Sequence, residues 1–176
     1  YFAVAAALGG GPTVIEGIIP NSLQGDVQLL EWLRLWGVQV EWEDHRVTVQ
    51  AKEGWRPPCF DLDLAEMPDA AMTLAVLSLF APGPCVLRNI GSWRFKETDR
   101  ILAMAQELTK VGAQVETTED SIQVVPPLQW RSPVIETYDD HRMAMCFSLL
   151  VLGGIDVRIL HPGCVQKTFP GYFAIF

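Results

Sequence analysis

Four basic residues stand out because each lies where an apolar helical pattern is about to begin. Lys96 and Arg100 occur in SWRFKETDR, Arg142 in YDDHRMAM and Lys167 in HPGCVQKTFP. The start of a helix carries a partial positive charge, which disfavours an exposed cation by about 0.3–1 kcal/mol. The free N–H groups at the same place attract anions. Cations collected at helix starts, in a chain of formal net charge −8, therefore predict a site for a small anion.

The spacing of these cations suggests how such an anion is held. A helix that has begun by Lys96 places Lys96 and Arg100 on one face, because they stand at i and i+4. Arg142 and Lys167 lie in later segments and could converge on the same pocket. Arginine grips a carboxylate or phosphate with two parallel hydrogen bonds, whereas lysine acts as a point charge.

Acidic residues beside these cations could move protons, which requires a group within hydrogen-bond reach of the proton. They are Asp69 in MPDAAM, Glu97 in KETDR, and Asp139 and Asp140 in YDDHRMAM. Each also has a structural interpretation. Asp69 could be a helix cap, Glu97 could form a solvated pair with Arg100, and Asp140 could be the partner that a buried Arg142 needs. Asp139 and His141 are interpreted as structural.

The elements that must position these residues recur along the chain. A small-apolar helix, a glycine break and a β-branched strand occur in YFAVAAALGGGPTVIEGI, AAMTLAVLSLFAPGPCVLRNI and RMAMCFSLLVLGGIDVRIL. An amphipathic helix, a glycine and two strands occur in 26–49 and again in 99–124, where Gly37 matches Gly112. We therefore expect three repeats, about 1–62, 63–134 and 135–176, of which the first and the last are incomplete.

The hydrophobic patterns of these elements predict the layers of the fold. The helices after Asp69 and Arg142 are apolar nearly all round, so they must be buried on every side. The strands alternate between polar and apolar residues, as in 46–49. This favours an α/β fold with helices inside and sheets outside, which is inverted relative to the usual α/β barrel. Because the chain opens without Met, inside an apolar run, we also expect it to be a fragment.

Composition excludes several classes of protein. The 176 residues are 49% hydrophobic but only 19% charged, below the usual ~25%, so a partner lobe is expected to cover part of the surface. A pI of about 4.8 argues against nucleic-acid binding. No apolar run approaches the ~18 residues of a membrane span, and no signal peptide is visible. Four cysteines without metal-binding spacing suit a reducing cytoplasm.

Several long motifs together carry a resemblance to a known family. PDAAM, NIGSWRFKETDR, TYDDHRMAMCFSL and KTFPGYF, with NSLQGD near the start, resemble the C-terminal half of the 5-enolpyruvylshikimate-3-phosphate synthases, the shikimate-pathway family inhibited by glyphosate. The likeness runs through essentially all of residues 1–176. It implies a single C-terminal lobe of a two-lobe enzyme, with three βαβαββ units to a lobe and the helices packed inside (the enolpyruvyl transferase fold).

The resemblance implies a transferase reaction of aromatic amino-acid biosynthesis. The enolpyruvyl group of phosphoenolpyruvate passes to the 5-hydroxyl of shikimate 3-phosphate, and phosphate is released. No metal, no cofactor and no covalent enzyme intermediate are needed. The same likeness implies a monomeric parent protein and a missing N-terminal lobe that supplies most contacts to the shikimate phosphate. We therefore expect the fragment alone to fold but to turn over negligibly.

Carried over by motif, the resemblance also implies residue roles. Asp69 contacts the shikimate hydroxyls and accepts the 5-OH proton, Lys96 touches the same hydroxyl region, and Glu97 handles the proton at C3. Ser92, where many relatives have Asn, is a weakened contact to shikimate 3-phosphate. Gly171 replaces the common Asp of TFPDYF, which loosens the turn after Lys167. The groups implied to bind phosphoenolpyruvate are Arg100, Arg142 and Lys167.

Two other functions remain open from the sequence. One is the related UDP-N-acetylglucosamine enolpyruvyl transferase, although the KETDR and DDHRMAM motifs favour the shikimate enzyme. The other is a non-catalytic repeat domain that only binds anions. Anion binding by such a domain would not change when Asp69 or Glu97 is replaced.

Overall fold

The middle of the chain forms a run of six elements in a computed structural model that describes residues 1–9 and 11–176. They are β4 (Asp61–Asp63), α3 (Pro68–Leu77), β5 (Cys85–Arg88), α4 (Arg100–Val111), β6 (Gln114–Thr117) and β7 (Ile122–Val125). The sheet has the order β4-β5-β7-β6, in which β4 and β5 are parallel and the other pairs antiparallel. The run is therefore a β-α-β-α-β-β unit.

The other two runs are parts of the same unit. The first contains α1 (Phe2–Gly9), β1 (Thr13–Glu16), α2 (Gln28–Leu35), β2 (Gln39–Glu43) and β3 (Arg46–Gln50). Its antiparallel order β1-β3-β2 matches β5-β7-β6. The last contains β8 (Val134–Ile135), α5 (His141–Ser148), β9 (Arg158–Ile159) and α6 (Tyr172–Ile175). Its parallel β8-β9 pair matches β4-β5. The division of the chain into three units at fixed residues stays a prediction.

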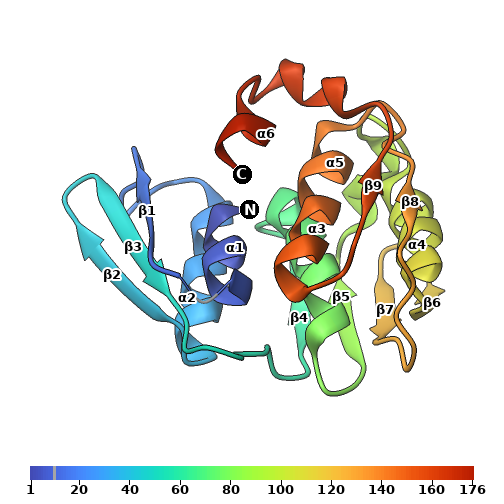
Figure 1. Ribbon diagram of the computed structural model, residues 1–176, viewed down its shortest axis with the longest axis horizontal. Coiled ribbons are helices and arrows are strands. Elements are labelled where there is room, and N and C mark those ends of the chain that lie inside the picture. The colour runs from blue at the N-terminus through green and yellow to red at the C-terminus, as the bar shows by residue number, and fades with distance from the viewer. Residues whose placement is uncertain (10) are drawn as a thin grey trace.

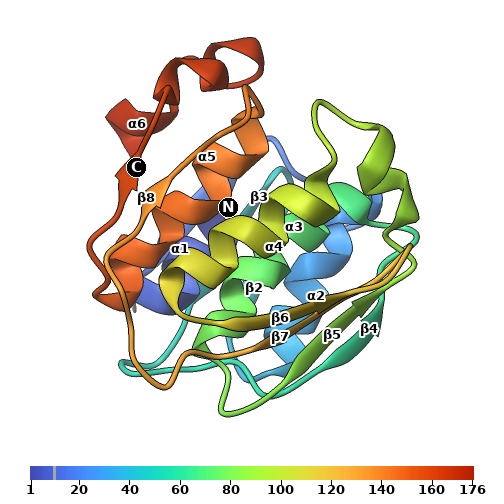
Figure 2. The same ribbon diagram turned by 90° about the vertical axis from the view of Figure 1, so that its right-hand side faces the viewer.

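The helices lie inside and the sheets outside, which confirms the predicted fold class. Figure 1 shows α1, α3 and α5 in the middle, with the β1-β3-β2 sheet on one side and the other sheets on the opposite side. Figure 2, turned by 90°, shows β4 to β7 running beneath the helices. Every residue of α3 from Ala70 to Leu77 is buried, as an all-apolar helix requires. Among the described residues, no helix has the length and apolar character needed to cross a membrane.

Matching glycines end the two amphipathic helices. Gly37 follows α2 with φ 88° and Gly112 follows α4 with φ 112°, both in the left-handed region that favours glycine. At Gly112 an added Cβ would also lie 2.5 Å from the carbonyl oxygen of Gln129. The predicted match between these two glycines is thus confirmed by backbone conformation.

Candidate active site

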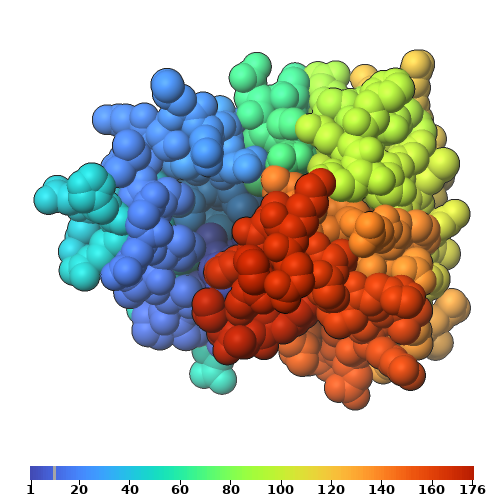
Figure 3. All heavy atoms as spheres, turned by 90° about the horizontal axis from the view of Figure 1, so that it is seen from above, coloured from blue at the N-terminus to red at the C-terminus, as the bar shows by residue number. Residues whose placement is uncertain are grey.

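The starts of three buried or half-buried helices meet at one cluster of charged side chains. Arg100 is the first residue of α4, Asp69 is the second residue of α3, and Asp140 directly precedes α5. Their side chains are hydrogen-bonded to one another. Figure 3 shows the face above these helices, which is hollowed between the first unit in blue and the C-terminal segment in red. A pocket of about 510 Å³ lies on the same side, lined in part by Tyr1, Asp26 and Arg142.

Arg100 is the buried centre of the cluster, with 1% of its side chain exposed. Its Nε donates to Asp140 Oδ2 at 2.7 Å, its Nη1 to Asp69 Oδ1 at 3.0 Å and its Nη2 to Glu97 Oε2 at 2.7 Å. A buried cation is tolerated only when it is paired and hydrogen-bonded, and three carboxylates from three segments meet that need. The pair with Glu97 is therefore not a solvated surface pair.

Asp69 joins two arginines instead of capping its helix. Its Oδ2 accepts from Arg142 Nη2 at 2.7 Å and its Oδ1 from Arg100 Nη1 at 3.0 Å. The cap at the start of α3 comes from elsewhere, because the backbone N–H of Ala70 donates to Asp26 Oδ1 at 3.1 Å. The interpretation of Asp69 as a helix cap is thus wrong, and its carboxylate is available to the cations.

Arg142 takes its partners from distant parts of the chain. Besides Asp69, its Nη1 donates to the hydroxyl of Tyr1 at 3.1 Å. Asp140, the partner suggested by the sequence, instead accepts the backbone N–H of Arg142 at 2.8 Å and the guanidinium of Arg100. The predicted Asp140–Arg142 side-chain pair is therefore wrong, because Asp140 caps α5 and is committed to Arg100.

Lys96 lies outside the helix that the sequence suggested. The Oδ1 of Asp99 accepts the backbone N–H of Leu102 at 3.2 Å, so Asp99 is the N-cap and α4 begins at Arg100. Lys96 and Arg100 consequently do not share a helix face. Lys96 still reaches the cluster from the preceding turn, with its Nζ 3.9 Å from Asp69 Oδ1.

Glu97 connects the cluster to the C-terminal segment. Its Oε1 accepts from Lys167 Nζ at 2.7 Å, while its Oε2 accepts from Arg100. The hydrogen bond from Lys167 is the main cause that lowers the pKa of Glu97 to about 2. Lys167 itself is 60% exposed. Glu97 is therefore an ionised carboxylate whose pKa depends on one exposed lysine.

His141 lies beside these carboxylates without pairing to them. Its side chain is 4% exposed, and its Nδ1 is 3.9 Å from Glu97 Oε1 and 3.9 Å from Asp140 Oδ1. Within the described residues this Nδ1 has no hydrogen-bond partner. Burial lowers the pKa of His141, which favours a neutral imidazole.

Ser92 is the one implied site residue that the structure leaves apart from the cluster. It lies in the short 3-10 helix Gly91–Phe95 and is exposed. No hydrogen bond joins its side chain to the charged groups within the described parts of the chain. Any role for Ser92 would require a ligand that extends beyond the cluster.

The charges of the cluster indicate what it can bind. It contains three carboxylates and four cations, which are Asp69, Glu97, Asp140, Lys96, Arg100, Arg142 and Lys167. Arg100 is closed off by carboxylates, whereas Lys96, Arg142 and Lys167 keep 35%, 23% and 60% of their side chains exposed. The exposed cations can receive an anion, and the carboxylates they release can then accept or give protons.

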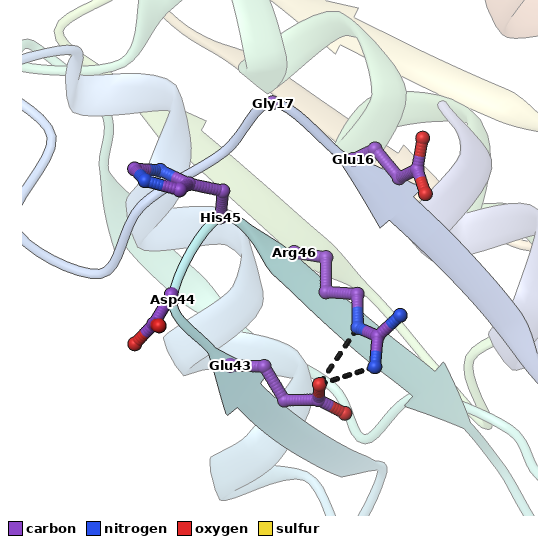
Figure 4. A pocket seen from close by; sticks show the side chains of 6 residues that line it. All are labelled: Glu16, Gly17, Glu43, Asp44, His45 and Arg46. Atoms are coloured by element: carbon purple, nitrogen blue, oxygen red, sulfur yellow. Dashed lines mark hydrogen bonds and ion pairs between the residues drawn. The ribbon is translucent and has the colours of Figure 1, made fainter.

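A second hollow of about 580 Å³ lies at the turn between β2 and β3 and contains none of the clustered residues. Figure 4 shows its charged pair, in which Arg46 Nε donates to Glu43 Oε2 at 2.7 Å, while Asp44 and His45 point away from the pair. Its arginine is already neutralised by a carboxylate of the same hairpin, so this hollow is a weaker candidate than the cluster.

Tyr1 and Asp26 belong to the cluster's surroundings but were not predicted from the sequence. Asp26 ends NSLQGD, a motif that contributed to the family resemblance but was given no role at the site. Nothing in the sequence pattern marks Tyr1 as a partner of Arg142, because the contact joins residues 141 positions apart.

Comparisons with known proteins agree with this architecture. The family profile of EPSP synthase (3-phosphoshikimate 1-carboxyvinyltransferase) matches residues 1–176. The chain is 54% identical to the 3-phosphoshikimate 1-carboxyvinyltransferase of Thiobacillus denitrificans, and 53% identical to that of Cupriavidus necator. All of this chain is covered in both matches, but only 41% and 42% of those relatives. The chain therefore spans about two fifths of the length of the curated relatives it matches.

Solved structures show the same fold. The EPSP synthase of Acinetobacter baumannii superposes with a TM-score of 0.81 at 25% identity, covering 99% of this chain and 43% of that chain. The enolpyruvyl transferase NikO of Streptomyces tendae gives a TM-score of 0.69 at 19% identity over 98% of this chain and 40% of that one, which shows the fold alone. With a full-length profile match and relatives above 50% identity, the chain belongs to the EPSP synthase family.

Proposed function

We propose that the protein containing this chain transfers the enolpyruvyl group of phosphoenolpyruvate to the 5-hydroxyl of shikimate 3-phosphate and releases phosphate. The observation that carries the proposal is the convergence of Lys96, Arg100, Arg142 and Lys167 on Asp69 and Glu97. The curated relatives named 3-phosphoshikimate 1-carboxyvinyltransferase support the same activity. This chain supplies the phosphoenolpyruvate side of the site.

The cluster suits the proton transfers of this reaction. As the 5-hydroxyl adds to C2 of phosphoenolpyruvate, Asp69 accepts its proton, with Lys96 touching the same hydroxyl. Glu97, once protonated, gives its proton to C3 and recovers a proton from C3 when phosphate leaves. The departing phosphate takes up the proton that Asp69 accepted, so both carboxylates return to their starting state. Fixed cations stabilise the negative charge that develops on the departing phosphate. This role falls to the partly exposed Arg142 and Lys167, with Arg100 as a buried positive charge behind them.

The ion pairs suggest how substrate binding prepares these groups. In the ligand-free structure, Asp69 is bound by Arg142, and Glu97 by Lys167. The carboxylate and phosphate of phosphoenolpyruvate replace Asp69 and Glu97 as partners of these two cations. Losing Lys167 removes the main cause that holds the pKa of Glu97 at about 2, so the affinity of this carboxylate for a proton rises. Binding of the anion thus activates both proton-transfer groups.

A partner lobe is needed to complete the site. The chain spans 41% of the length of the Thiobacillus denitrificans relative, and its cluster leaves the cations Lys96, Arg142 and Lys167 partly exposed. We propose the N-terminal lobe of a monomeric two-lobe enzyme as the partner. Four free thiols, Cys59, Cys85, Cys146 and Cys164, support a reducing cytoplasm as its compartment.

The proposal is tested by completing the protein. A chimera in which this chain replaces the matching 41% of the Thiobacillus denitrificans relative should release phosphate from phosphoenolpyruvate only when shikimate 3-phosphate is present. Lys167→Met should raise the KM for phosphoenolpyruvate about tenfold or more, whereas Lys52→Met, an exposed lysine in the 51–60 loop, should change it little. A folded chimera that accepts UDP-N-acetylglucosamine instead would establish the rival transferase. Anion binding without turnover would establish a binding domain.

A further inference from the structure

A buried carboxylate on α4 has no part in the proposed reaction. Glu107 is 0% exposed, although a buried charge needs partners to be tolerated. Lys110 Nζ donates to Glu107 Oε1 at 2.8 Å and to Oε2 at 2.7 Å. The backbone N–H of Glu136 donates to Oε2 at 3.1 Å. The hydroxyl of Tyr138 lies 2.7 Å from Glu107 Oε1 and 2.7 Å from Gln106 Oε1, and these two acceptors share its one proton. Glu107 therefore ties α4 to the segment that follows β8.

That segment has an unfavourable backbone conformation that something must maintain. Tyr138 and Asp139 both have left-handed φ angles, 52° and 56°, which residues other than glycine rarely adopt. Such conformations persist only where the surrounding structure holds them. The bonds from Tyr138 and Glu136 to Glu107 provide this restraint. Burial and the bond to Glu107 also raise the pKa of Tyr138, so its hydroxyl remains a donor.

Asp140 connects this restrained segment to the charged cluster. Asp140 follows the two left-handed residues, and its side chain is bound to Arg100 and to the first turn of α5. The segment 136–140 is therefore attached to α4 at two points, to Glu107 where it leaves β8 and to Arg100 where it enters α5. Arg100 and Glu107 stand at i and i+7, two turns apart on one face of the helix.

The repeat shows that the unit does not require this carboxylate to fold. Gly37 and Gly112 end the matching helices α2 and α4. Counting back from each glycine places Trp32 where α4 has Glu107. Trp32 packs against the hydrophobic core. A buried Glu at this place in the second unit is thus specific to the helix that borders the cluster.

We propose that Glu107 is a positioning residue, whose carboxylate fixes the 136–140 segment and thereby aims Asp140 and Arg142 at the phosphoenolpyruvate site. The inference rests on the proposed function and deepens it. If the 136–140 segment relaxes, the start of α5 shifts and Arg142 leaves its place. The substrate bound by Arg142 is affected, whereas the shikimate phosphate, held mainly by the other lobe, is not.

The test measures both Michaelis constants in the chimera described above. Glu107→Gln, which keeps the shape but cannot accept all four hydrogen bonds, should raise the KM for phosphoenolpyruvate about tenfold. The KM for shikimate 3-phosphate should change less than about twofold, in line with a local displacement. Tyr138→Phe, which removes one of the four bonds, should shift the same constant in the same direction by a smaller factor. Glu31→Gln, on the exposed side of α2, is the control.

A purely structural role predicts a different result. Loss of folded protein lowers the apparent kcat and leaves both KM values unchanged, and this outcome would overturn the proposal. So would wild-type constants in Glu107→Gln, or an equal rise in both KM values. If Glu107→Gln does not fold, Tyr138→Phe decides by the same criteria. The wild-type chimera distinguishes this inference from the proposed function. If the proposed function is wrong, the wild-type chimera releases no phosphate; if only the inference about Glu107 is wrong, it still does.

Discussion

Arg100 illustrates how a buried charge depends on partners that come from different helices. Its guanidinium is held by Asp69, Glu97 and Asp140, and Asp140 is itself 0% exposed. Removing the cation leaves that carboxylate buried and uncompensated. Arg100→Met should therefore lower the free energy of unfolding by about 3–5 kcal/mol, measured by urea unfolding of the chain.

The control for Arg100 is an exposed pair of the same chemistry. Arg34 and Glu31 pair on α2 with 55% and 49% of their side chains exposed, and such pairs contribute about 0–1 kcal/mol. Arg34→Met should therefore cost far less than Arg100→Met. Similar losses for the two variants would contradict the view that burial makes Arg100 essential.

The pKa of Glu97 gives a second prediction at this scale. Lys167→Met should raise it from about 2 toward its ordinary value of 4.5, because the hydrogen bond from Lys167 is the main cause of the shift. A depressed carboxyl pKa stabilises the folded state above the ordinary value, and the contribution is lost as pH falls from 4.5 to about 2. NMR titration of the Glu97 carboxyl measures the pKa directly.

The stability of the Lys167 variant should follow the same sign. At pH 7 it should be less stable than wild type by only about 0–1 kcal/mol, since Lys167 is exposed, and the difference should close as the pH falls toward 2. Lys52→Met should leave the Glu97 pKa in place. An unchanged Glu97 pKa in Lys167→Met would show that the backbone hydrogen bond of Glu97 and the charge of Arg100 set it without Lys167.

The identities of these charged residues could be predicted from sequence, but their pairings could not. Cations at the start of apolar helices indicated a shared anion site, and the four basic residues do converge. The partner of Arg142 was expected beside it, at Asp140, yet is Asp69, 73 residues away. Pairing depends on how side chains from separate helices meet in space, which a linear pattern does not contain.

At the scale of elements, a glycine controls how the first unit meets the second. A Cβ on Gly25 would lie 1.7 Å from the carbonyl oxygen of Glu66, and the neighbouring Asp26 caps the backbone of α3 at Ala70. Gly25→Ala should push these loops apart and lower the free energy of unfolding by about 1–3 kcal/mol.

Thermal or urea unfolding of the chain measures this cost. Gly163→Ala is the matched control, because a Cβ there meets no atom within 4 Å. The same substitution should therefore be nearly neutral at Gly163. Equal stability of the two variants would mean that the loops around Gly25 can move apart without lowering the free energy of unfolding. The cap from Asp26 would then not depend on the position of these loops.

The order of elements followed from the hydrophobic patterns, whereas one helix start did not. Buried helices and the glycines that end α2 and α4 were predicted because each has a strong local cause. The shared face of Lys96 and Arg100 required a helix that had begun by Lys96, and this condition is not met, because Asp99 is the N-cap and α4 begins at Arg100.

At the scale of the whole molecule, the cluster is assembled but open. The hydrophobic patterns predicted the layers, because helices that are apolar nearly all round must be buried on every side. The chain spans 41% of the Thiobacillus denitrificans relative, and the second lobe proposed to close over the cluster would come from the rest of such a protein. Lys96 and Lys167, with 35% and 60% of their side chains exposed, show how much of the site faces solvent.

An open site leads to the last prediction, which concerns the isolated chain. It should fold cooperatively, because one continuous core includes residues from all three runs of elements. It should nevertheless turn over negligibly, because catalysis needs both substrates held in register and water excluded.

The measurement is phosphate release with both substrates present, first from the chain alone and then after mixing with the remaining part of the Thiobacillus denitrificans relative. Activity should appear only in the mixture. Substantial release by the chain alone would show that the cluster needs no second lobe, and the proposed division of labour between the lobes would have to be abandoned.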